Sequence, residues 1–157
     1  MEDTPNTVWI DADACPRVVK DIVYRAVHKR KIQAILVANS YQQHPRSERI
    51  RMIVVAKEPD EADNTILEKC KTSDLVITAD IILADKLVKK GVIAINPRGE
   101  VYTDANVGNR LATRNLMSDL RDEGVVRGGP SNYSERDKQK FASSLDKYLT
   151  LLKKAAK

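Results

Sequence analysis

The sequence contains few of the side chains that build zinc sites or catalytic triads. Its 157 residues include two cysteines, Cys15 and Cys70, and two histidines, His28 and His44. The cysteines have neither the number nor the spacing of a disulfide scaffold or a zinc motif. Two histidines provide little material for a histidine-built zinc site or a histidine-based triad. Any chemistry here is therefore expected to depend mainly on carboxylates.

Long apolar runs are also missing. No segment approaches the ~18 apolar residues that a membrane-spanning helix needs, and Met1-Glu2-Asp3 does not resemble the start of a secretory signal. Hydrophobic residues make up 42% and charged residues 31% of the chain, a balance typical of folded, soluble domains. We therefore expect one cytoplasmic domain over residues 1–157 with no membrane partner, and the sequence leaves its oligomeric state open.

The formal net charge of +5 is concentrated near the end of the chain. Residues 1–135 contain 20 basic and 20 acidic side chains, whereas residues 136–157 contain seven basic and two acidic ones. At ~100° per residue, one helix face would carry Arg136, Lys140, Lys147 and Lys154. A separate apolar stripe would contain Phe141, Leu145, Tyr148 and Leu152. The basic face is either a solvated helix surface or a surface that follows nucleic-acid phosphates.

Short apolar runs alternate with segments of helical periodicity. Runs rich in Val, Ile and Leu predict strands at about 8–10, 34–37, 52–55, 75–78 and 92–95. Helices are expected from Pro16, from Pro59 to about Cys70, and through Leu83 to Gly91. Continuous apolar strands separated by helices are typical of parallel sheets covered on both faces. The sequence therefore predicts an α/β three-layer sandwich of Rossmann type, with a mostly parallel central sheet of about five strands.

The pattern changes after the fifth expected strand. The α/β core is predicted at about residues 7–96, followed by a helical appendage at about 104–155 that packs on it. The appendage is expected to contain two C-terminal helices, roughly 104–123 and 134–155, separated by a turn at Gly128-Gly129-Pro130.

Acidic residues follow several of the expected strands. Asp11 and Asp13 come after the first strand, an acidic group at 60–63 comes after the third, and Asp80 comes after the fourth, with Asp85 about one helical turn later. Open parallel sheets bind their ligands beyond the carboxyl ends of the strands. Because the first and fourth strands are expected to be neighbours, the acids that follow them should converge.

Crowded carboxylates repel one another, and a bound cation relieves that repulsion. Ligands that are all oxygen, with no histidine or cysteine, favour Mg²⁺ or Mn²⁺ over zinc. Such ions activate water and clamp the oxygens of a phosphoryl group. The pattern thus indicates a Mg²⁺ or Mn²⁺ cofactor.

Several of these acids also have a purely structural interpretation. Asp60 and Asp63 are spaced like a helix capping box, Asp80 is placed to cap the next helix, and Asp85 is placed to be a surface residue. A helix that begins at Pro16 needs neither of the aspartates after the first strand as a cap.

Five motifs in order resemble the YaiI/YqxD family of uncharacterised bacterial proteins. They are Trp-Ile-Asp-Ala-Asp-Ala-Cys-Pro at 9–16, Asp-Glu-Ala-Asp-Asn at 60–64, Asp-Leu-Val-Ile-Thr-Ala-Asp at 74–80, Asn-Pro-Arg-Gly-Glu at 96–100 and Gly-Gly-Pro at 128–130. The resemblance extends from about Val8 to Leu149. That family is grouped by fold with PIN-like domains, many of which are metal-dependent ribonucleases, so the resemblance implies a single PIN-like domain.

A looser resemblance to the PIN nucleases themselves implies roles for individual acids. Asp11, Asp63 and Asp80 would bind the metal, with Asp13 supporting catalysis and Asp85 supporting metal binding. The chain departs from that pattern in two ways. Its second acid lies at a helix start rather than in a longer helical insertion, and two C-terminal helices extend a minimal PIN domain.

The first functional hypothesis is a Mg²⁺- or Mn²⁺-dependent nuclease whose partner is nucleic acid, with RNA favoured. Candidate contacts to the substrate are Asn39, Ser40, Arg46, Arg49, Asn64 and Arg98. Two of the arginines lie in a polar loop at 41–49 that we expect to be mobile. A solvated surface explains the arginines equally well.

Two other classes of function stay open at this point. Asp11-Ala-Asp13 resembles the nucleophile and acid/base pair of haloacid-dehalogenase-like phosphatases, with Ser40 and the pair Asp80 and Asp85 in the expected order. Cys15 stands where that group usually has Thr or Val, and no cap insertion is visible. Alternatively, the chain is a binding module that holds nucleotides or RNA without turning them over.

Overall fold

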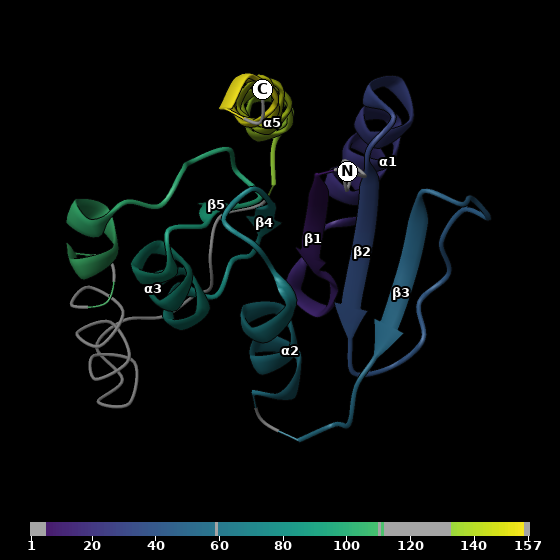
Figure 1. Ribbon diagram of the computed structural model, residues 1–157, viewed down its shortest axis with the longest axis horizontal. Helices are drawn as coiled ribbons and strands as arrows, with labels where there is room; N and C mark the ends of the chain where they lie inside the picture. The colour runs from purple at the N-terminus through teal and green to yellow at the C-terminus, as the bar shows by residue number, and fades with distance from the viewer. Residues whose placement is uncertain (1–5, 59, 110, 112–132, 156–157) are drawn as a thin grey trace.

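The computed structural model describes residues 6–58, 60–109, 111 and 133–155 of the chain (Figure 1). Its strands are β1 (Thr7–Asp11), β2 (Gln33–Ala38), β3 (Ile50–Val54), β4 (Leu75–Ile77) and β5 (Ile93–Ile95). Its helices are η1 (Ala12–Ala14), α1 (Arg17–Arg30), α2 (Glu61–Lys69), α3 (Ile81–Lys90) and α5 (Glu135–Ala155). The strands form one parallel sheet in the order β3-β2-β1-β4-β5, so the predicted α/β class and parallel sheet are confirmed.

Helices cover both faces of the sheet. Successive residues of a strand point to opposite faces, so each strand packs against helices on both sides. Val8 and Ile10 of β1 pack with α1 and α5 in one buried cluster. Trp9, between them, faces the other way and packs with α2 and α3. Every residue of β1 is buried, as expected for the central strand of a sheet with two covered faces. The result is the predicted three-layer sandwich.

Helix α5 forms part of one outer layer, beside α1. Its buried side chains are Phe141, Leu145, Leu149 and Leu152, whereas Tyr148 is half-buried. The predicted apolar stripe is therefore confirmed, because all four of its residues pack in or against the core, and Leu149 is buried beside them. Arg30 of α1 forms an ion pair with Asp146, which fastens the two helices together. The basic side chains of Arg136, Lys140 and Lys147 are exposed.

Most element boundaries lie within two residues of the prediction. Helix α1 begins at Arg17 rather than at Pro16, and β3 begins at Ile50, two residues earlier than expected. Residues 104–109 are helical, but the rest of the helix expected at about 104–123 and the turn at 128–130 lie outside the described residues, residue 111 excepted.

The segment between β2 and β3 returns the chain to the amino end of the sheet without a helix. It lies along α1, where Lys20 donates a hydrogen bond to Gln42 and a ring nitrogen of His28 lies 2.9 Å from the Ser47 hydroxyl. At its end, the carbonyl of Arg49 accepts a hydrogen bond from the N–H of Ala34, the second residue of β2. The loop that was expected to be mobile is thus held to α1 at two places.

No helix in the described part of the chain combines the length and apolar character needed to cross a membrane.

Candidate functional site

A cleft of about 480 Å³ opens at the carboxyl ends of the central strands. Its walls carry five aspartates from three segments: Asp11 and Asp13 after β1, Asp60 and Asp63 at the start of α2, and Asp80 at the start of α3. We call it the carboxylate cleft. The segments meet because β1 and β4 are neighbours in the sheet, as the sequence predicted, and α2 crosses the same edge.

Asp11 is the last residue of β1 and is 7% exposed. Its Oδ2 accepts a hydrogen bond of 2.8 Å from the hydroxyl of Thr78. Burial raises the pKa of Asp11, the Thr78 hydroxyl lowers it, and the charges of Asp80 and Asp13 raise it further. Asp11 is therefore a buried, oriented carboxylate at the floor of the cleft.

Asp80 is fixed by the first turn of α3. Its Oδ1 accepts hydrogen bonds from the N–H groups of Ile82 and Leu83, at 2.9 and 3.4 Å. The structural interpretation of Asp80 as a helix cap is thus correct. Its own backbone N–H donates to the hydroxyl oxygen of Thr78 at 3.0 Å. One threonine side chain therefore positions both Asp11 and Asp80.

Asp63 is the acid whose ionisation the cleft disturbs most. Burial raises its pKa to about 7, with further contributions from the charge of Asp80, the charge of Asp11, a hydrogen bond with Asp80 and the charge of Asp60. The surroundings of this carboxyl therefore favour its protonated form. The crowding expected from the sequence is real, and part of it is relieved by protonation.

Asp60 precedes α2 in the left-handed region, with φ of +68°, and its side chain makes no capping hydrogen bond. The capping-box interpretation of Asp60 and Asp63 is therefore wrong. Aspartate adopts this backbone region more readily than most residues, although at some cost.

Asp13 stands at the mouth of the cleft and is exposed. Its Oδ2 accepts a 2.9 Å hydrogen bond from the N–H of Asn39, and its Oδ1 accepts a 3.1 Å hydrogen bond from the side-chain amide of Gln42. These contacts tie the segment after β1 to the segment after β2. Asn39 also lines the cleft.

Several predicted site residues lie elsewhere. Asp85 pairs with Lys89 on α3 at 3.0 Å and does not line the cleft. Arg49 is at the amino end of the sheet, opposite the cleft, and Arg46 precedes it on the same segment. Ser40 and Asn64 are exposed and are not among the lining residues.

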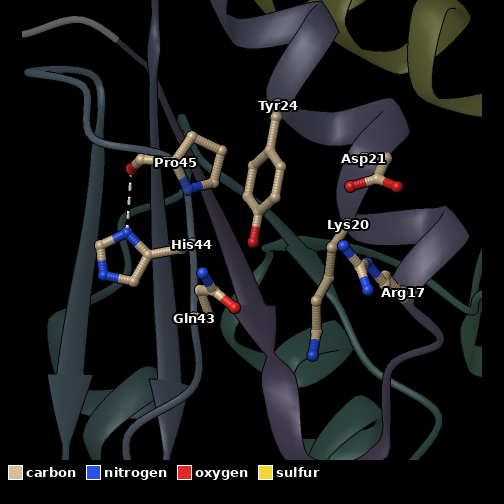
Figure 2. Close-up of a pocket in the computed structure, with 7 residues that line it drawn as sticks. All are labelled: Arg17, Lys20, Asp21, Tyr24, Gln43, His44 and Pro45. Atoms are coloured by element: carbon tan, nitrogen blue, oxygen red, sulfur yellow. Dashed lines mark hydrogen bonds between the residues drawn. The ribbon is translucent and has the colours of Figure 1, made fainter.

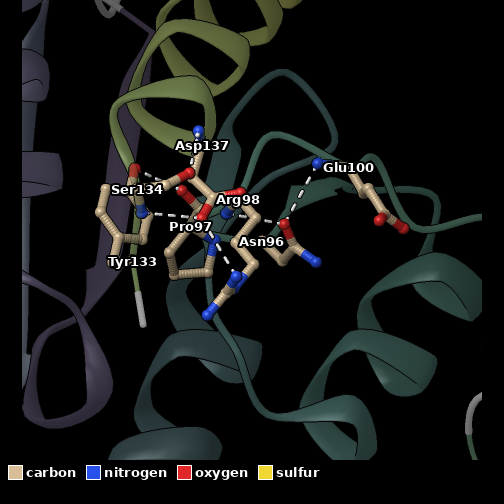
Figure 3. A network of polar contacts seen from close by, with 7 residues as sticks. All are labelled: Asn96, Pro97, Arg98, Glu100, Tyr133, Ser134 and Asp137. Carbon is tan, nitrogen blue, oxygen red and sulfur yellow. Dashed lines mark hydrogen bonds and ion pairs between the residues drawn. The ribbon is translucent and has the colours of Figure 1, made fainter. Parts of the chain in front are cut away.

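Arg98 belongs to a polar network that joins the turn after β5 to α5 (Figure 3). The side-chain oxygen of Asn96 accepts hydrogen bonds from the N–H groups of Arg98 and Glu100. The guanidinium of Arg98 contacts Asp137 of α5 at 3.0 Å. The contacts of Arg98 that Figure 3 shows are therefore structural ones.

A family model described as "Uncharacterized BCR, YaiI/YqxD family" matches residues 9–151. The chain belongs to this family. The resemblance drawn from the five motifs is thereby confirmed.

Relatives in this family align over nearly their full length. A UPF0178 protein from Stutzerimonas stutzeri is 51% identical over 94% of this chain and 98% of its own. A UPF0178 protein from Trichlorobacter lovleyi is 50% identical over 96% of this chain and 98% of its own. A UPF0178 protein from Dechloromonas aromatica is 51% identical over 90% of this chain and 95% of its own. No solved structure matches the chain significantly. These names state no activity, so function has to be argued from the cleft.

The donor set of the cleft fits a hard divalent cation in kind, because all its acidic side chains offer oxygen. Within the described ranges, however, no three His, Cys, Asp or Glu side chains are arranged so that they hold a metal ion as they stand.

Sequence reasoning missed several residues at this site. Ile10 pairs with Ile77 in the parallel register, so the next residues of the two strands, Asp11 and Thr78, lie opposite each other. A parallel alignment of the first and fourth expected strands would have identified Thr78 as the neighbour of Asp11. Lys57 and Glu58 line the cleft after β3, and no periodicity or motif marks them.

Cys15 is not suited to be a nucleophile. Burial raises the pKa of its thiol to about 12, with a smaller contribution from the charge of Asp11, whereas Lys20 lowers it. The interpretation of Cys15 as a packing residue is thus supported, but burial rather than the neighbouring acids is the main cause.

Proposed function

We propose that the carboxylate cleft is the active site of a divalent-metal-dependent phosphodiester hydrolase that acts on RNA. Asp11, Asp63 and Asp80 would hold Mg²⁺ or Mn²⁺. The observation that carries this proposal is a single cleft lined by five aspartates from three segments, in which Asp11 and Asp80 are held by hydrogen bonds. The raised pKa of Asp63 agrees with this crowding.

Such crowding has a free-energy cost in the metal-free protein, because like charges repel and a buried carboxylate loses hydration. The folded chain reduces this cost by protonating Asp63. A divalent cation would replace that proton, so cation binding should release protons near neutral pH. This is the behaviour expected of a site built for a cation rather than for packing.

Different residues of the cleft would have different roles in the reaction. Thr78 and the first turn of α3 hold Asp11 and Asp80 in fixed orientations, which lowers the reorganisation needed on binding. A bound Mg²⁺ or Mn²⁺ would lower the pKa of water and clamp the phosphoryl oxygens. Asp13, which accepts a hydrogen bond from the N–H of Asn39, would take a proton from the attacking water. Lys57 offers a positive charge to the phosphate.

Cleavage of an end-labelled single-stranded RNA tests this proposal. We expect cleavage by the wild-type protein in Mn²⁺ or Mg²⁺, none in EDTA, and a loss of about 100-fold or more in Asp11→Asn and Asp63→Asn. Asp85→Asn is the matched control, since Asp85 is also an aspartate of α3 but lies outside the cleft. The control should cleave like the wild type.

Two results would contradict the proposal. One is the absence of metal-dependent cleavage by folded wild-type protein. The other is a phosphoenzyme trapped at Asp11 with a small phosphomonoester, because an aspartyl-phosphate belongs to a phosphatase mechanism and not to metal-assisted hydrolysis of a phosphodiester.

A further inference from the structure

A second cavity, of about 390 Å³, lies between α1 and the segment that joins β2 to β3 (Figure 2). Helix α1 contributes Arg17, Lys20, Asp21 and Tyr24, and the segment contributes residues 43–45. Figure 2 shows the hydroxyl of Tyr24 pointing toward the space between Gln43 and Lys20, whereas the ring of His44 is turned toward the carbonyl of Pro45. The proposed hydrolysis does not involve this cavity.

The cationic groups of the cavity have unused hydrogen-bonding capacity. The Arg17 side chain makes no ion pair or hydrogen bond with any residue the structure describes. Among the described residues Lys20 donates only to Gln42, which leaves two of its three N–H donors available. Asp21 offsets one of the two positive charges, so the lining keeps a net positive charge. Such donors suit a singly charged phosphodiester.

An exposed aromatic ring lies next to one of the residues that line the cavity. The Tyr41 side chain is 70% exposed, and its ring centroid lies 5.8 Å from that of His44, at an interplanar angle of 53°. His44 itself lines the cavity. The Tyr24 hydroxyl, which faces the cavity, makes no hydrogen bond with a described residue. Exposed aromatic rings together with cationic side chains are the combination on which unstacked nucleobases bind.

A single side chain connects this cavity to the carboxylate cleft. The amide oxygen of Gln42 accepts from Lys20, and the amide nitrogen of the same side chain donates to Asp13 at 3.1 Å. A nucleic-acid strand with one phosphate in the cleft would therefore have a neighbouring nucleotide near the cavity.

We propose that this cavity is a nucleotide subsite that selects single-stranded RNA. Arg17 and Lys20 bind a backbone phosphate, and Tyr41 stacks on the adjacent base. The role in substrate selection rests on the proposed function, whereas binding itself does not. A duplex is excluded because its bases are already stacked and its width exceeds a cavity of this volume.

Fluorescence anisotropy with a labelled 12-nucleotide single-stranded RNA in EDTA tests the proposal without any cleavage. We expect Tyr41→Ala to weaken binding about 5- to 100-fold and Tyr41→Trp to retain it. Arg17→Ala should weaken binding and lower the slope of log affinity against log salt by about 0.7. Arg25→Ala is the matched control, because Arg25 is exposed on the same helix but does not line the cavity, and it should bind like the wild type.

The same RNA annealed to its complement should bind at least about fivefold more weakly than the single strand. Equal affinity for both forms, or unchanged binding in Tyr41→Ala and Arg17→Ala, would overturn the proposal. If those variants also cleave with unchanged KM, the subsite fails while the proposed activity stands. If they lose binding although the wild type never cleaves, the subsite stands and the proposed activity fails. Unchanged melting temperatures confirm that each variant is folded.

Discussion

Thr78 donates a hydrogen bond of 2.8 Å from its hydroxyl to Oδ2 of Asp11, across the two central strands of the sheet. The same hydroxyl oxygen accepts the N–H of Asp80. Thr78 is 1% exposed, so water does not replace either contact. The hydroxyl thus holds one carboxylate directly and the backbone of another, and it opposes the rise in the pKa of Asp11 that burial causes.

Replacing Thr78 tests this relationship. Thr78→Val keeps the shape of the side chain but removes the donor to Asp11 and the acceptor for Asp80, so it should lower the free energy of unfolding by about 1–3 kcal/mol. It should also weaken Mn²⁺ binding about 10- to 100-fold. Thr78→Ser, which keeps the hydroxyl, should retain most of the wild-type stability and most of the Mn²⁺ affinity. Thermal melting with and without Mn²⁺ measures the two effects. Equal stability and equal Mn²⁺ binding in Thr78→Val and Thr78→Ser would contradict the role of the hydroxyl.

Asp80 has two separable roles, as a helix cap and as a charge in the cleft. Asp80→Ala removes the cap and should cost about 0.5–2 kcal/mol of stability in the metal-free protein. Asp80→Asn keeps a capping oxygen and removes the repulsion, so its metal-free stability should equal or exceed that of the wild type. Chemical denaturation in EDTA at pH 7 gives both values. A large loss in the Asn variant would show that the charge itself is structural.

The pKa of Asp63 predicts how metal-free stability depends on pH. Its value of about 7 in the folded chain lies above the ordinary 3.8, so between these values the folded state binds more protons than the unfolded state. The contribution to stability is fully present below about pH 3.8 and is lost as pH rises to about 7. Because Asp63 is partly exposed, we expect a loss of only about 1 kcal/mol, or roughly 2–4 °C in Tm.

Melting curves of the wild type and Asp63→Asn between pH 5 and 8 in EDTA measure this contribution. Relative to the wild type, the variant should gain stability as pH rises, because it has no carboxyl to ionise. A difference between the two proteins that does not change with pH would contradict the raised pKa.

Alanine substitutions at two glycines distinguish the free-energy cost of backbone strain from that of steric overlap. Both Gly91 and Gly99 have φ near +90°. A Cβ at Gly99 would lie 2.6 Å from a backbone carbon of Lys140, whereas at Gly91 the nearest atom is 3.8 Å away. Gly91→Ala should therefore cost about 1–2 kcal/mol, and Gly99→Ala roughly 2–4 kcal/mol, because α5 has to move. Equal losses in chemical denaturation would show that α5 does not pack closely on this turn.

The fold was largely predictable because its signals are local. Apolar runs such as 34–37 and 75–78 mark buried strands, and the spacing of Val19, Ile22 and Val23 marks α1. Those runs, with helices between them, define a parallel sheet whose switch point lies beside the first strand. The convergence of Asp11, Asp13 and Asp80 follows from that topology alone.

The rest of the site depends on the course of loops, for which the sequence has no periodic signal. Arg46 and Arg49 were expected to contact the substrate from a polar loop thought to be mobile, but this loop returns along α1 to the opposite end of the sheet. Asp85 follows Asp80 by five residues, which on a helix turns its side chain away from the cleft toward Lys89. Lys57 reaches the cleft from an irregular segment.

Diffraction from crystals soaked in Mn²⁺, recorded where the ion scatters anomalously, tests the central claim most directly. We expect one strong anomalous peak in the carboxylate cleft, about 2.0–2.2 Å from oxygens of Asp11, Asp63 and Asp80, and its loss in Asp11→Asn. A cleft without a peak at saturating Mn²⁺, or an ion bound only outside it, would contradict the claim that these aspartates form a metal-dependent active site.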